Sequence, residues 1–332
     1  MGIAGMATVS ARSLITIGLL LTCTFLVGAQ RAAAEDYPTR PIKLFVGASA
    51  GGTTDTIARA LAEAIAPALK QPVVIENRPG AGGNLAADTV AKSTPDGYTL
   101  LVSFTSHTIN ATLYPHLPYD PVADFTAISE IATVPSLLVG NPKLPAGDLK
   151  ALIDLARAKP DRLTIALGGI GSSLHLASAQ FKMMTGVQLL DVPYKGTSPA
   201  LADVLGGHVD LMFISLLTGT EQVRAGNLRA YGVTSARRQP SFPDLPAIGE
   251  IVPGFESSAW FGLFGPANLP GPITQKLSAV ILAALRDPKL SERLRDEGAS
   301  AVGSTPSEFA AFVREDIKHW APIVQQSGAK PD

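Results

Sequence analysis

Residues 47–59 read GASAGGTTDTIAR, and they follow directly on the apolar run Ile42–Val46. The run predicts a strand, and apolar residues then recur at helical spacing from Ile57 to Leu69. Glycine has no side chain, so the glycine pair between them lets the backbone come close to a ligand. The first turn of a helix carries unpaired N–H groups and about half a positive charge, so it can bind an anion without a basic side chain. The stretch therefore predicts a helix start that is a candidate anion site.

Strand and helix patterns alternate along most of the chain, and this alternation indicates the fold class. Short apolar runs bounded by glycine, proline or polar residues indicate strands, and longer runs with helical spacing indicate helices. Further strands are expected at 73–76, 99–104, 163–167, 189–192, 211–214, 230–234 and 259–264, and helices at 53–69, 84–92, 149–158, 173–185, 199–205, 219–225, 273–285, 290–297 and 306–326. The pattern predicts an α/β fold with a largely parallel sheet.

Three helix starts carry capping signals. Ser198 is followed by a first-turn proline, and Thr218 and Thr305 each stand three residues before a glutamate. No Gly/Ser-rich linker divides the chain, so two domains would be joined by short extended segments. Residues 129–140 and 230–236 are the candidates, and two crossings make one of the domains discontinuous.

The N-terminus has the order of a secretory signal peptide. Residues 1–13 are uncharged apart from the amino terminus and Arg12, residues 14–29 are almost wholly apolar, and three alanines end at Ala34. This order predicts cleavage after Ala34. A membrane anchor is the alternative, but the apolar run is shorter than the roughly 20 residues that a span needs. We therefore expect a periplasmic protein whose mature chain begins at about Glu35.

The composition excludes several function classes. A net charge of −1 gives no basic surface for nucleic acid or an anionic membrane. The one cysteine, Cys23, lies in the predicted signal peptide, so the mature chain would have no disulfide. A chain of this length buries about 75% of its unfolded surface and folds without such cross-links. Its length suggests about two domains.

Three further loops also place glycine or hydroxyl residues between a strand and a helix. They read SFTSHTIN at 103–110, LGGIGSSLHL at 167–176 and VPYKGTSPAL at 192–201. One such loop alone is most simply a turn before a capped helix. Several of them in one α/β chain favour an anion site. The hydroxyls that would add to it belong to Ser49, Thr53, Ser172 and Ser173.

Motifs of other function classes fail on inspection of the sequence. The glycines at 169 and 171 lack the third glycine of the dinucleotide fingerprint G-x-G-x-x-G, and neither a G-x-x-x-x-G-K-[ST] phosphate loop nor a G-x-S-x-G elbow occurs. The five histidines show no paired metal-ligand spacing, so no metal is expected. Ser173 and His175 leave a serine hydrolase as an alternative, although both stand on one early helical turn and no third residue completes a triad.

Some side chains near these loops have both a structural and a binding interpretation. Asp55 complements the helix dipole in the first turn, which favours a structural role over contact with a ligand amine. His107 and His175 fit a hydrogen-bonding residue beside a cleft and a ligand contact equally well. Trp260 indicates core packing more than a ligand platform.

Five stretches together resemble one protein family. They are residues 47–59, VIENRPGAGGNLAADTVAKSTPDGYTL from Val74, GGIGSSLHLASAQF from Gly168, DVPYKGTSPALADVLGGHVDLMF from Asp191 and LRAYGVTSARRQPSFPDLPAIGE from Leu228. They resemble the extracytoplasmic substrate-binding proteins of tripartite tricarboxylate transporters, the Bug family. The resemblance covers essentially the whole mature chain. The chain departs from the family pattern at residues 48–50, where prolines and a further glycine are usual, so this turn is less rigid and gains the Ser49 hydroxyl.

The resemblance implies a two-lobed periplasmic-binding-protein fold of the Venus flytrap kind, each lobe a mainly parallel sheet flanked by helices. Residues 35–135 and 236–332 would form the first lobe, and residues 136–235 the second. Loops 49–55 and 168–173 would grip a carboxylate from opposite sides. The candidate ligand-binding residues are Ser49, Ala50, Gly51, Gly52, Thr53, Asp55, Phe104, Thr105, Ser106, His107, Asn110, Gly168, Gly169, Gly171, Ser172, Ser173, His175, Lys195, Gly196, Thr197 and Asp210.

The function implied by the resemblance is that of a receptor rather than an enzyme. It would capture a small mono- or dicarboxylate in the periplasm and deliver it to the membrane permease subunits of the transporter, as a monomer without a cofactor. No cluster of arginines lines the loops, which disfavours a ligand with three full charges. A binding protein that serves a sensor kinase is an alternative that the sequence leaves open, whereas the motifs disfavour an ATP-driven transporter.

Overall fold

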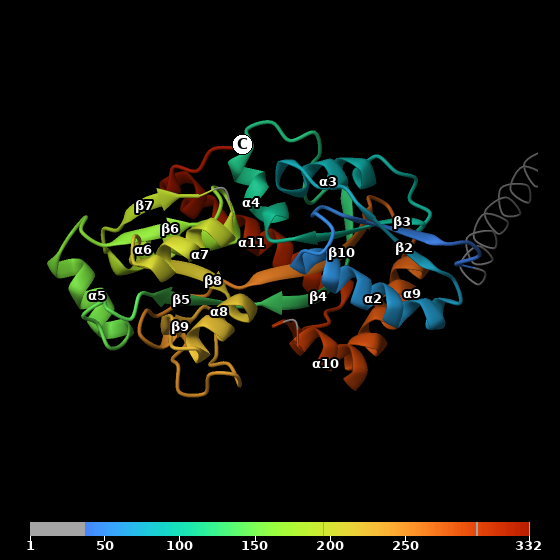
Figure 1. Ribbon diagram of the computed structural model, residues 1–332. Coiled ribbons are helices and arrows are strands. Elements are labelled where there is room, and N and C mark those ends of the chain that lie inside the picture. Colours follow the sequence, from blue (N-terminus) through green and yellow to red (C-terminus); the bar gives the residue numbers. More distant parts are fainter. Residues whose placement is uncertain (1–36, 195, 297, 332) are drawn as a thin grey trace, which may run out of the picture.

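The computed structural model describes residues 37–194, 196–296 and 298–331. The predicted signal peptide, residues 1–34, and Lys195 lie outside these ranges. The described chain forms two α/β lobes side by side, and the first lobe contains segments from both ends of the chain (Figure 1). Within these ranges, no helix is both long and apolar enough to cross a bilayer.

The first lobe is built on a six-stranded mixed sheet with the order β11-β4-β10-β3-β1-β2. Strand β1 pairs in parallel with β2 and β3, whereas β10 runs antiparallel between β3 and β4. The strands are β1 (Ile42–Val46), β2 (Val73–Asn77), β3 (Thr99–Phe104), β4 (Phe125–Val134), β10 (Ala259–Pro266) and β11 (Ser300–Ala301). The helices are α2 (Thr53–Leu69), η1 (Ala81–Gly83), α3 (Asn84–Ala91), α4 (Ser106–Leu113), α9 (Gly271–Arg286), α10 (Pro288–Asp296) and α11 (Pro306–Ser327).

The second lobe is built on a five-stranded mixed sheet with the order β7-β6-β8-β5-β9. Strand β6 pairs in parallel with β7 and β8, whereas β5 runs antiparallel between β8 and β9. The strands are β5 (Ser136–Gly140), β6 (Thr164–Leu167), β7 (Leu190–Pro193), β8 (Leu211–Ser215) and β9 (Arg229–Val233). The helices are α5 (Leu149–Ala158), α6 (Ser173–Thr185), α7 (Thr197–Gly206), α8 (Leu216–Arg224) and η2 (Ile248–Glu250).

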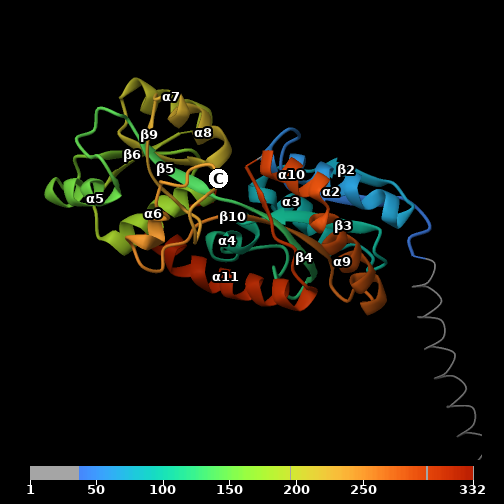
Figure 2. The same ribbon diagram turned by 90° about the horizontal axis from the view of Figure 1, so that it is seen from below.

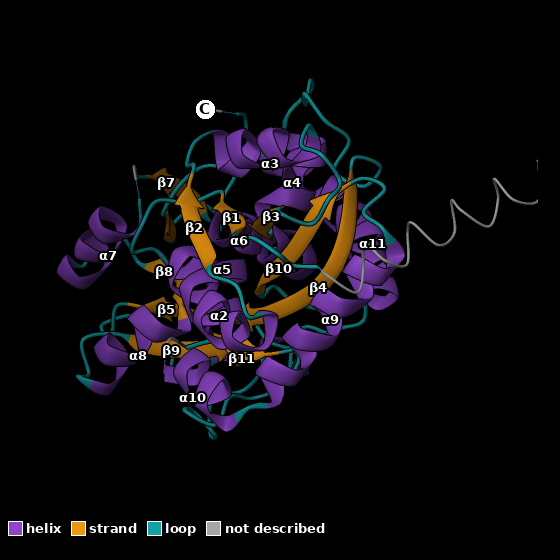
Figure 3. Ribbon diagram, turned by 90° about the vertical axis from the view of Figure 1, so that its right-hand side faces the viewer, coloured by secondary structure: helices purple, strands orange, loops and turns teal. Residues whose placement is uncertain are grey.

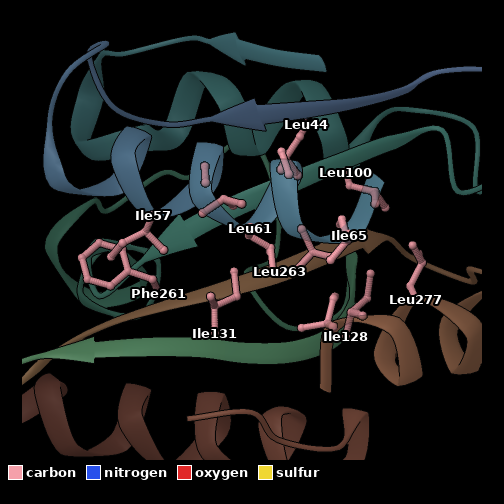
Figure 4. Packing of buried hydrophobic residues seen from close by; sticks show 14 of the residues in the cluster. Leu44, Ile57, Leu61, Ile65, Leu100, Ile128, Ile131, Phe261, Leu263 and Leu277 are labelled. Carbon is pink, nitrogen blue, oxygen red and sulfur yellow. The ribbon is translucent and has the colours of Figure 1, made fainter. Parts of the chain in front are cut away.

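Helix α2 packs on the first sheet through the apolar face that the sequence predicts. Ile57, Leu61 and Ile65 recur every four residues and are buried. Figure 4 shows them packed against side chains of the sheet, among them Leu44 of β1 and Leu263 of β10. Burying each such side chain stabilises the fold by about 1.5–3 kcal/mol. This packing fixes the direction of α2 and therefore the place where the helix begins.

Helices cover both faces of the first sheet. Residues of α2, α9 and α10 form the core on one face, and residues of α3 and α11 pack on the other. Figure 3 shows the long strand β4 curving across this lobe. The pairing of β4 with β10 shifts register twice, between Phe261 and Gly262 and between Leu263 and Phe264. Such irregularities bend and twist a strand, which accounts for the curvature.

The pairing register places the carboxyl ends of the parallel strands of both lobes beside the chain crossings. In the first lobe, Phe104 at the end of β3 pairs with Phe261 near the start of β10, where the chain arrives from the second lobe. In the second lobe, Ser136 directly follows the first crossing and pairs with Ser215 at the end of β8, to which β6 is parallel. The loops that follow β1, β3, β6 and β8 therefore lie at the facing edges of the two sheets.

Helix α11 extends beneath both lobes (Figure 2). It begins with the predicted capping box, because the Thr305 side chain accepts from the Glu308 N–H and the Glu308 side chain accepts from the Thr305 N–H. Its later residues join a cluster with helices of both lobes, made of Ile109, Leu113, Leu176, Ala179, Trp320, Ile323 and Val324. The C-terminal helix therefore ties α4 of the first lobe to α6 of the second.

The second crossing lies later in the chain than the boundary expected at residue 235. Val233 forms a parallel bridge with Ala247, and Val252 and Phe255 pack in the core of the second lobe. The Ser257 N–H donates to the carbonyl of Thr234, directly before β10. The segment up to about Ser257 therefore packs with the second lobe.

The predicted two-lobed α/β fold is confirmed, and its sheets are mixed because β10 and β5 run antiparallel to their neighbours. Helices α2, α5 and α6 begin and end at the predicted residues. The capping predictions at Ser198 and Thr218 are wrong. Helix α7 begins at Thr197, two residues before the predicted start, with Gly196 before it. Helix α8 is capped by Ser215, whose side chain accepts from the Thr218 N–H.

Candidate functional site

Four loops at the facing edges contain most of the expected ligand-binding residues. They are the β1–α2 and β3–α4 loops of the first lobe and the β6–α6 and β7–α7 loops of the second. In α/β sheets, ligands bind outside the carboxyl ends of the strands, and helix starts there favour anions. The position of these loops therefore fits a site shared by the two lobes.

The start of α2 offers backbone donors that the protein itself does not use. Gly51 has φ +80°, a left-handed conformation that favours glycine, and Gly52 precedes the helix in an extended conformation. No described side chain caps this helix. The N–H groups of Thr53 and Thr54 have no acceptor among the described residues, as expected for a first turn. The exposed residues of this loop are Ser49, Ala50, Gly51, Gly52 and Thr53.

Asp55 shapes this loop from within. Its Oδ2 accepts from the Gly51 N–H at 2.8 Å and from Arg59 Nε at 2.9 Å, and its Oδ1 accepts from Asn77 Nδ2 at 2.9 Å. Burial alone would raise the pKa of this carboxyl, but the three hydrogen bonds outweigh it and hold the pKa below its usual value. The side chain is 3% exposed. These contacts support a structural role for Asp55. The Gly51 N–H is already bonded to Asp55 and is not free for a ligand.

A second glycine loop, residues 80–83, lies against the β1–α2 loop. A Cβ built on Gly47 would lie 2.9 Å from the Cα of Gly83, so the two backbones touch. Residues 80–83 all have positive φ, and Gly83 precedes α3 without a side-chain cap. This loop was not among the expected site residues, although the run of glycines after β2 could have indicated it. It adds a second uncapped helix start beside the first.

Phe104 and Asn110 support these two loops. The Phe104 ring lies within 3.5 Å of the Cβ positions built on Gly47 and Gly83, so it packs beneath both. Asn110 is buried, and its Nδ2 donates to the Gly82 carbonyl at 3.2 Å and to Asn84 Oδ1 at 2.8 Å. The structure therefore uses Asn110 to hold the second glycine loop instead of facing it to a ligand.

The β3–α4 loop is mostly buried, contrary to its expected role in the pocket. Thr105 Oγ1 accepts from the Trp260 N–H at 2.9 Å. His107 is 2% exposed, its Nε2 donates to the Pro121 carbonyl at 2.8 Å, and its ring stacks 4.8 Å from that of Phe264. Burial lowers the pKa of His107 to about 4. His107 is thus a neutral core residue, and Ser106 at the start of α4 is partly exposed.

The β6–α6 loop is a glycine turn before a capped helix. Gly169 and Gly171 have φ +141° and +73°. Ser172 is the N-cap, because its Oγ accepts from the His175 N–H at 3.3 Å, and it also donates to the Gly169 carbonyl at 2.7 Å. This leaves the Ser173 and Leu174 N–H groups without acceptors among the described residues. The start of α6 therefore has a side-chain cap, which the start of α2 lacks.

His175 is committed to this turn and not to catalysis. Its Nδ1 accepts from the Gly171 N–H at 3.0 Å, and the residue is 2% exposed. Burial lowers the pKa of His175, which keeps the ring neutral. Within the described residues, no hydrogen bond joins it to Ser173. The arrangement gives the hydrolase interpretation no nucleophile–base pair.

The start of α7 lies beside the β6–α6 loop. Gly196 has φ +130° and precedes the helix without a side-chain cap. A Cβ built on Gly168 would lie 3.2 Å from the Cα of Thr197. The second lobe therefore presents two neighbouring helix starts, α6 and α7, as the first lobe presents α2 and α3.

Asp210 lies at the wrong edge of the second sheet for ligand contact. Its Oδ2 accepts from the N–H and the hydroxyl of Thr164 at 2.8 and 2.9 Å. Thr164 begins β6, whereas Gly168 directly follows its end. Asp210 therefore joins the amino ends of β6 and β8, away from the crossings.

The two lobes touch close to these loops. A Cβ built on Gly171 would lie 2.7 Å from Leu113 Cδ2, so the β6–α6 loop of the second lobe meets α4 of the first. Two arginines that follow the first-lobe loops are already paired: Arg59 with Asp55, and Arg78 with Glu76. The donors that remain near the loops are therefore mainly backbone N–H and hydroxyl groups.

Comparison with known proteins identifies close relatives along almost the whole chain. The family model described as Tripartite tricarboxylate transporter family receptor matches residues 57–329. Protein BugT of Bordetella pertussis is 38% identical over 322 residues, which cover 96% of this chain and 98% of that protein.

Two solved structures share the fold across both lobes. The R. palustris protein Rpa4515 with adipate has a TM-score of 0.76 and 37% identity, covering 90% of this chain and 100% of that one. MatC from Rhodopseudomonas palustris with bound malate has a TM-score of 0.72 and 35% identity, covering 87% of this chain and 100% of that one.

Proposed function

Because the chain belongs to the receptor family of tripartite tricarboxylate transporters, we propose that it captures a mono- or dicarboxylate in the periplasm and delivers it to the membrane permease. In this proposal the ligand lies between the lobes and is held by helix starts from both. Ser173 and His175 have no catalytic role in it.

The observation that carries the proposal is the uncapped start of α2 at the edge that faces α6 and α7. A ligand bound with micromolar affinity needs about −8 kcal/mol. Each charge-assisted hydrogen bond contributes roughly 1.5–3 kcal/mol, and each helix dipole adds up to about 2 kcal/mol. The N–H groups of Thr53, Thr54 and Ser173 and the hydroxyl of Ser49 would supply most of this, less the entropic cost of capture.

The chemistry of the relatives supports the same ligand class. The solved structures contain adipate and malate, which each carry two carboxylates. Helix starts on two lobes provide two places for such groups. Among the described residues of these loops, the pairing of Arg59 and Arg78 with acidic residues leaves little basic charge for a third carboxylate.

The family and the predicted signal peptide support the periplasmic location and the transporter partner of this proposal. We expect a monomer that needs no cofactor. A receptor that serves a sensor kinase would use the same site, and a pull-down of membrane partners distinguishes the two. Recovery of permease subunits supports transport, and recovery of a sensor kinase supports sensing.

Isothermal titration against malate, adipate, benzoate and citrate tests the proposal. We expect one site that prefers a mono- or dicarboxylate. Gly52→Val should abolish binding without unfolding the protein, because Gly52 has an ordinary φ of −82° but the added side chain blocks the helix start. Gly147→Val is the matched control, since Gly147 is exposed and a Cβ there meets nothing within 4 Å. Unchanged affinity of Gly52→Val, or no binding of any organic acid, would contradict the proposal.

A further inference from the structure

A second cavity lies beside the crossings, on the side of the first sheet that α11 covers. Its volume is about 480 Å³, and its walls come from β4, β10, α11 and the segment before β10. It is separate from the four loops of the candidate ligand site. The side chains that give the cavity its character are those of Glu130, Glu256, Asp316, Trp260, Phe312 and Trp320.

Glu130 is a largely buried residue of this cavity, and its carboxylate makes no hydrogen bond to the described residues. The residue is only 8% exposed. Its backbone N–H donates to Ser304 Oγ at 2.9 Å, and its carbonyl accepts from the Ser129 hydroxyl at 3.0 Å. Among the described residues, nothing donates to its carboxylate oxygens. A buried charge is unfavourable unless an opposite charge or hydrogen bonds compensate it, so a cation beside Glu130 would favour the charged form of its carboxyl group.

The other polar groups of the lining are acidic or neutral. Asp316 Oδ2 accepts from the Thr108 hydroxyl at 2.6 Å and from Trp260 Nε1 at 2.7 Å, which fixes the carboxylate in the wall. Glu256 is exposed and stands at the opening. His319 is the one basic side chain among the described residues of the lining, which include neither lysine nor arginine. Acidic side chains therefore predominate among the charged groups of the cavity.

The arrangement of the lining favours an organic cation over a metal ion. Within the described ranges, no group of three or more His, Cys, Asp or Glu side chains is arranged to hold a metal ion. A larger cation can instead reach carboxylates that stand apart. Ammonium and guanidinium groups are also attracted to the faces of aromatic rings within about 6 Å, and the partly exposed ring of Phe312 lines the cavity. We propose that this pocket binds a small organic cation whose ammonium or guanidinium group pairs with Glu130.

The proposal gives the binding a pH dependence. The titratable groups that face the cavity are Glu130, Glu256, Asp316 and His319. Burial, with the charges of Asp316 and Glu256, raises the pKa of Glu130 to about 7. Glu130 is therefore charged and able to pair with a cation at pH 8, and it is mostly neutral at pH 6. Affinity should fall between these two values.

Titration with agmatine, which carries a guanidinium and an ammonium group, tests this inference. We expect one site per chain, with tighter binding at pH 8 than at pH 6. Glu130→Gln should weaken binding at least tenfold. Glu315→Gln is the matched control, because Glu315 lies exposed on α11, the helix that lines the cavity, and pairs with Lys318. Its affinity should equal that of the wild type.

Two further arms define the ligand and separate this site from the carboxylate site. N-Acetylargininamide carries the same guanidinium group on a peptide unit. If both probes bind, the pocket can also accept an arginine side chain of a protein partner. If only agmatine binds, the pocket accepts free cations alone. Gly52→Val should bind agmatine as the wild type does, whatever becomes of the organic acids. No binding of agmatine, or equal affinity in Glu130→Gln, overturns the inference.

Discussion

At the residue scale, Asp55 shows how a side chain beside a binding loop can shape the loop without facing the ligand. Its two oxygens accept from Gly51, Arg59 and Asn77, and Asn77 in turn donates to the Ala48 carbonyl at 3.0 Å. These bonds close the loop around a carboxylate that belongs to the protein. The N–H groups of Thr53 and Thr54, between Gly51 and Asp55, have no acceptor within the described ranges and remain free to bind a ligand.

Asp55→Ala should lower both stability and ligand affinity. Removing the carboxylate leaves the Gly51 N–H without an acceptor and the Asn77 amide with the Ala48 carbonyl alone, which costs about 1–3 kcal/mol of unfolding free energy. Loosening of the loop should weaken acid binding roughly tenfold, which corresponds to a loss of about 1.4 kcal/mol of binding free energy. Urea denaturation and titration calorimetry measure the two effects. Asp154→Ala, which removes an exposed pair with Lys150, is the control and should change both by little.

Glu130→Gln should stabilise the protein at pH 8 and leave it unchanged near pH 4. The pKa of Glu130 is raised to about 7 in the folded protein, so between about pH 4.5 and 7 this carboxyl group is ionised in the unfolded chain but mostly protonated in the folded one. Wild-type stability therefore falls as pH rises from about 4.5 to about 7, by roughly 3 kcal/mol for this residue. Denaturant midpoints at several pH values measure the gain. A variant that is less stable than the wild type at pH 8 would show that the carboxylate is compensated.

Residue type and spacing identified the loops but not the direction of individual side chains. His107, Asn110 and Asp210 were expected at the ligand, yet they bond to Pro121, Gly82 and Thr164. Each of these partners is distant in sequence or lies across the sheet, so no local pattern reveals the contact. The second glycine loop was missed for the same reason, because its position depends on the close approach of Gly47 to Gly83.

At the element scale, the starts of α2 and α6 differ in a way that matters for binding. Helix α2 begins without a side-chain cap, whereas Ser172 caps α6 and also bonds to Gly169. A cap stabilises a helix start but occupies one of its N–H groups. At α2 the Asp55 N–H, like those of Thr53 and Thr54, has no acceptor among the described residues, whereas at α6 the equivalent His175 N–H is bonded to Ser172. The start of α2 therefore offers one more free backbone donor than the start of α6.

Ser172→Ala should reduce stability and affinity together. Loss of an N-cap costs about 0.5–2 kcal/mol. The freed β6–α6 turn should also bind the acid less well. Thr305→Ala, which removes the cap of α11, should lower the unfolding free energy similarly while the dissociation constant stays the same. Equal affinity of Ser172→Ala and the wild type would remove the β6–α6 loop from the proposed site.

Local patterns predicted most elements because their apolar spacing is strong. Helices α2, α5 and α6 were predicted at their observed bounds. The starts of α7 and α8 were misplaced because several hydroxyl residues stand close together there, and Ser215 rather than Thr218 makes the cap. Strand β4 was not predicted, since it is held by β10, which arrives more than a hundred residues later in the sequence.

At the scale of the whole molecule, two crossings and one long helix connect the lobes. The crossings lie beside the facing loops, and α11 packs against α4 and α6 through Trp320, Ile323 and Val324. Closure of such lobes about short connections is a common response to a ligand. We therefore expect the lobes to move about the crossings while α11 keeps them joined.

Small-angle scattering should detect this movement. The radius of gyration of the wild type should fall when the best-binding acid of the panel is added. Gly52→Val should show no change at the same acid concentration, because it does not bind. Compaction of both proteins would instead indicate an effect of the acid on the solution. An unchanged wild type that binds the acid would mean that the lobes do not close.

The most direct test of a carboxylate held by helix starts from both lobes is nuclear magnetic resonance of the backbone amides during titration with that acid. We expect the N–H resonances of Thr53 and Thr54 in the first lobe and of Ser173 and Leu174 in the second to shift together, with one dissociation constant. Shifts confined to one lobe, or absent from all four amides while the acid binds, would contradict the shared site.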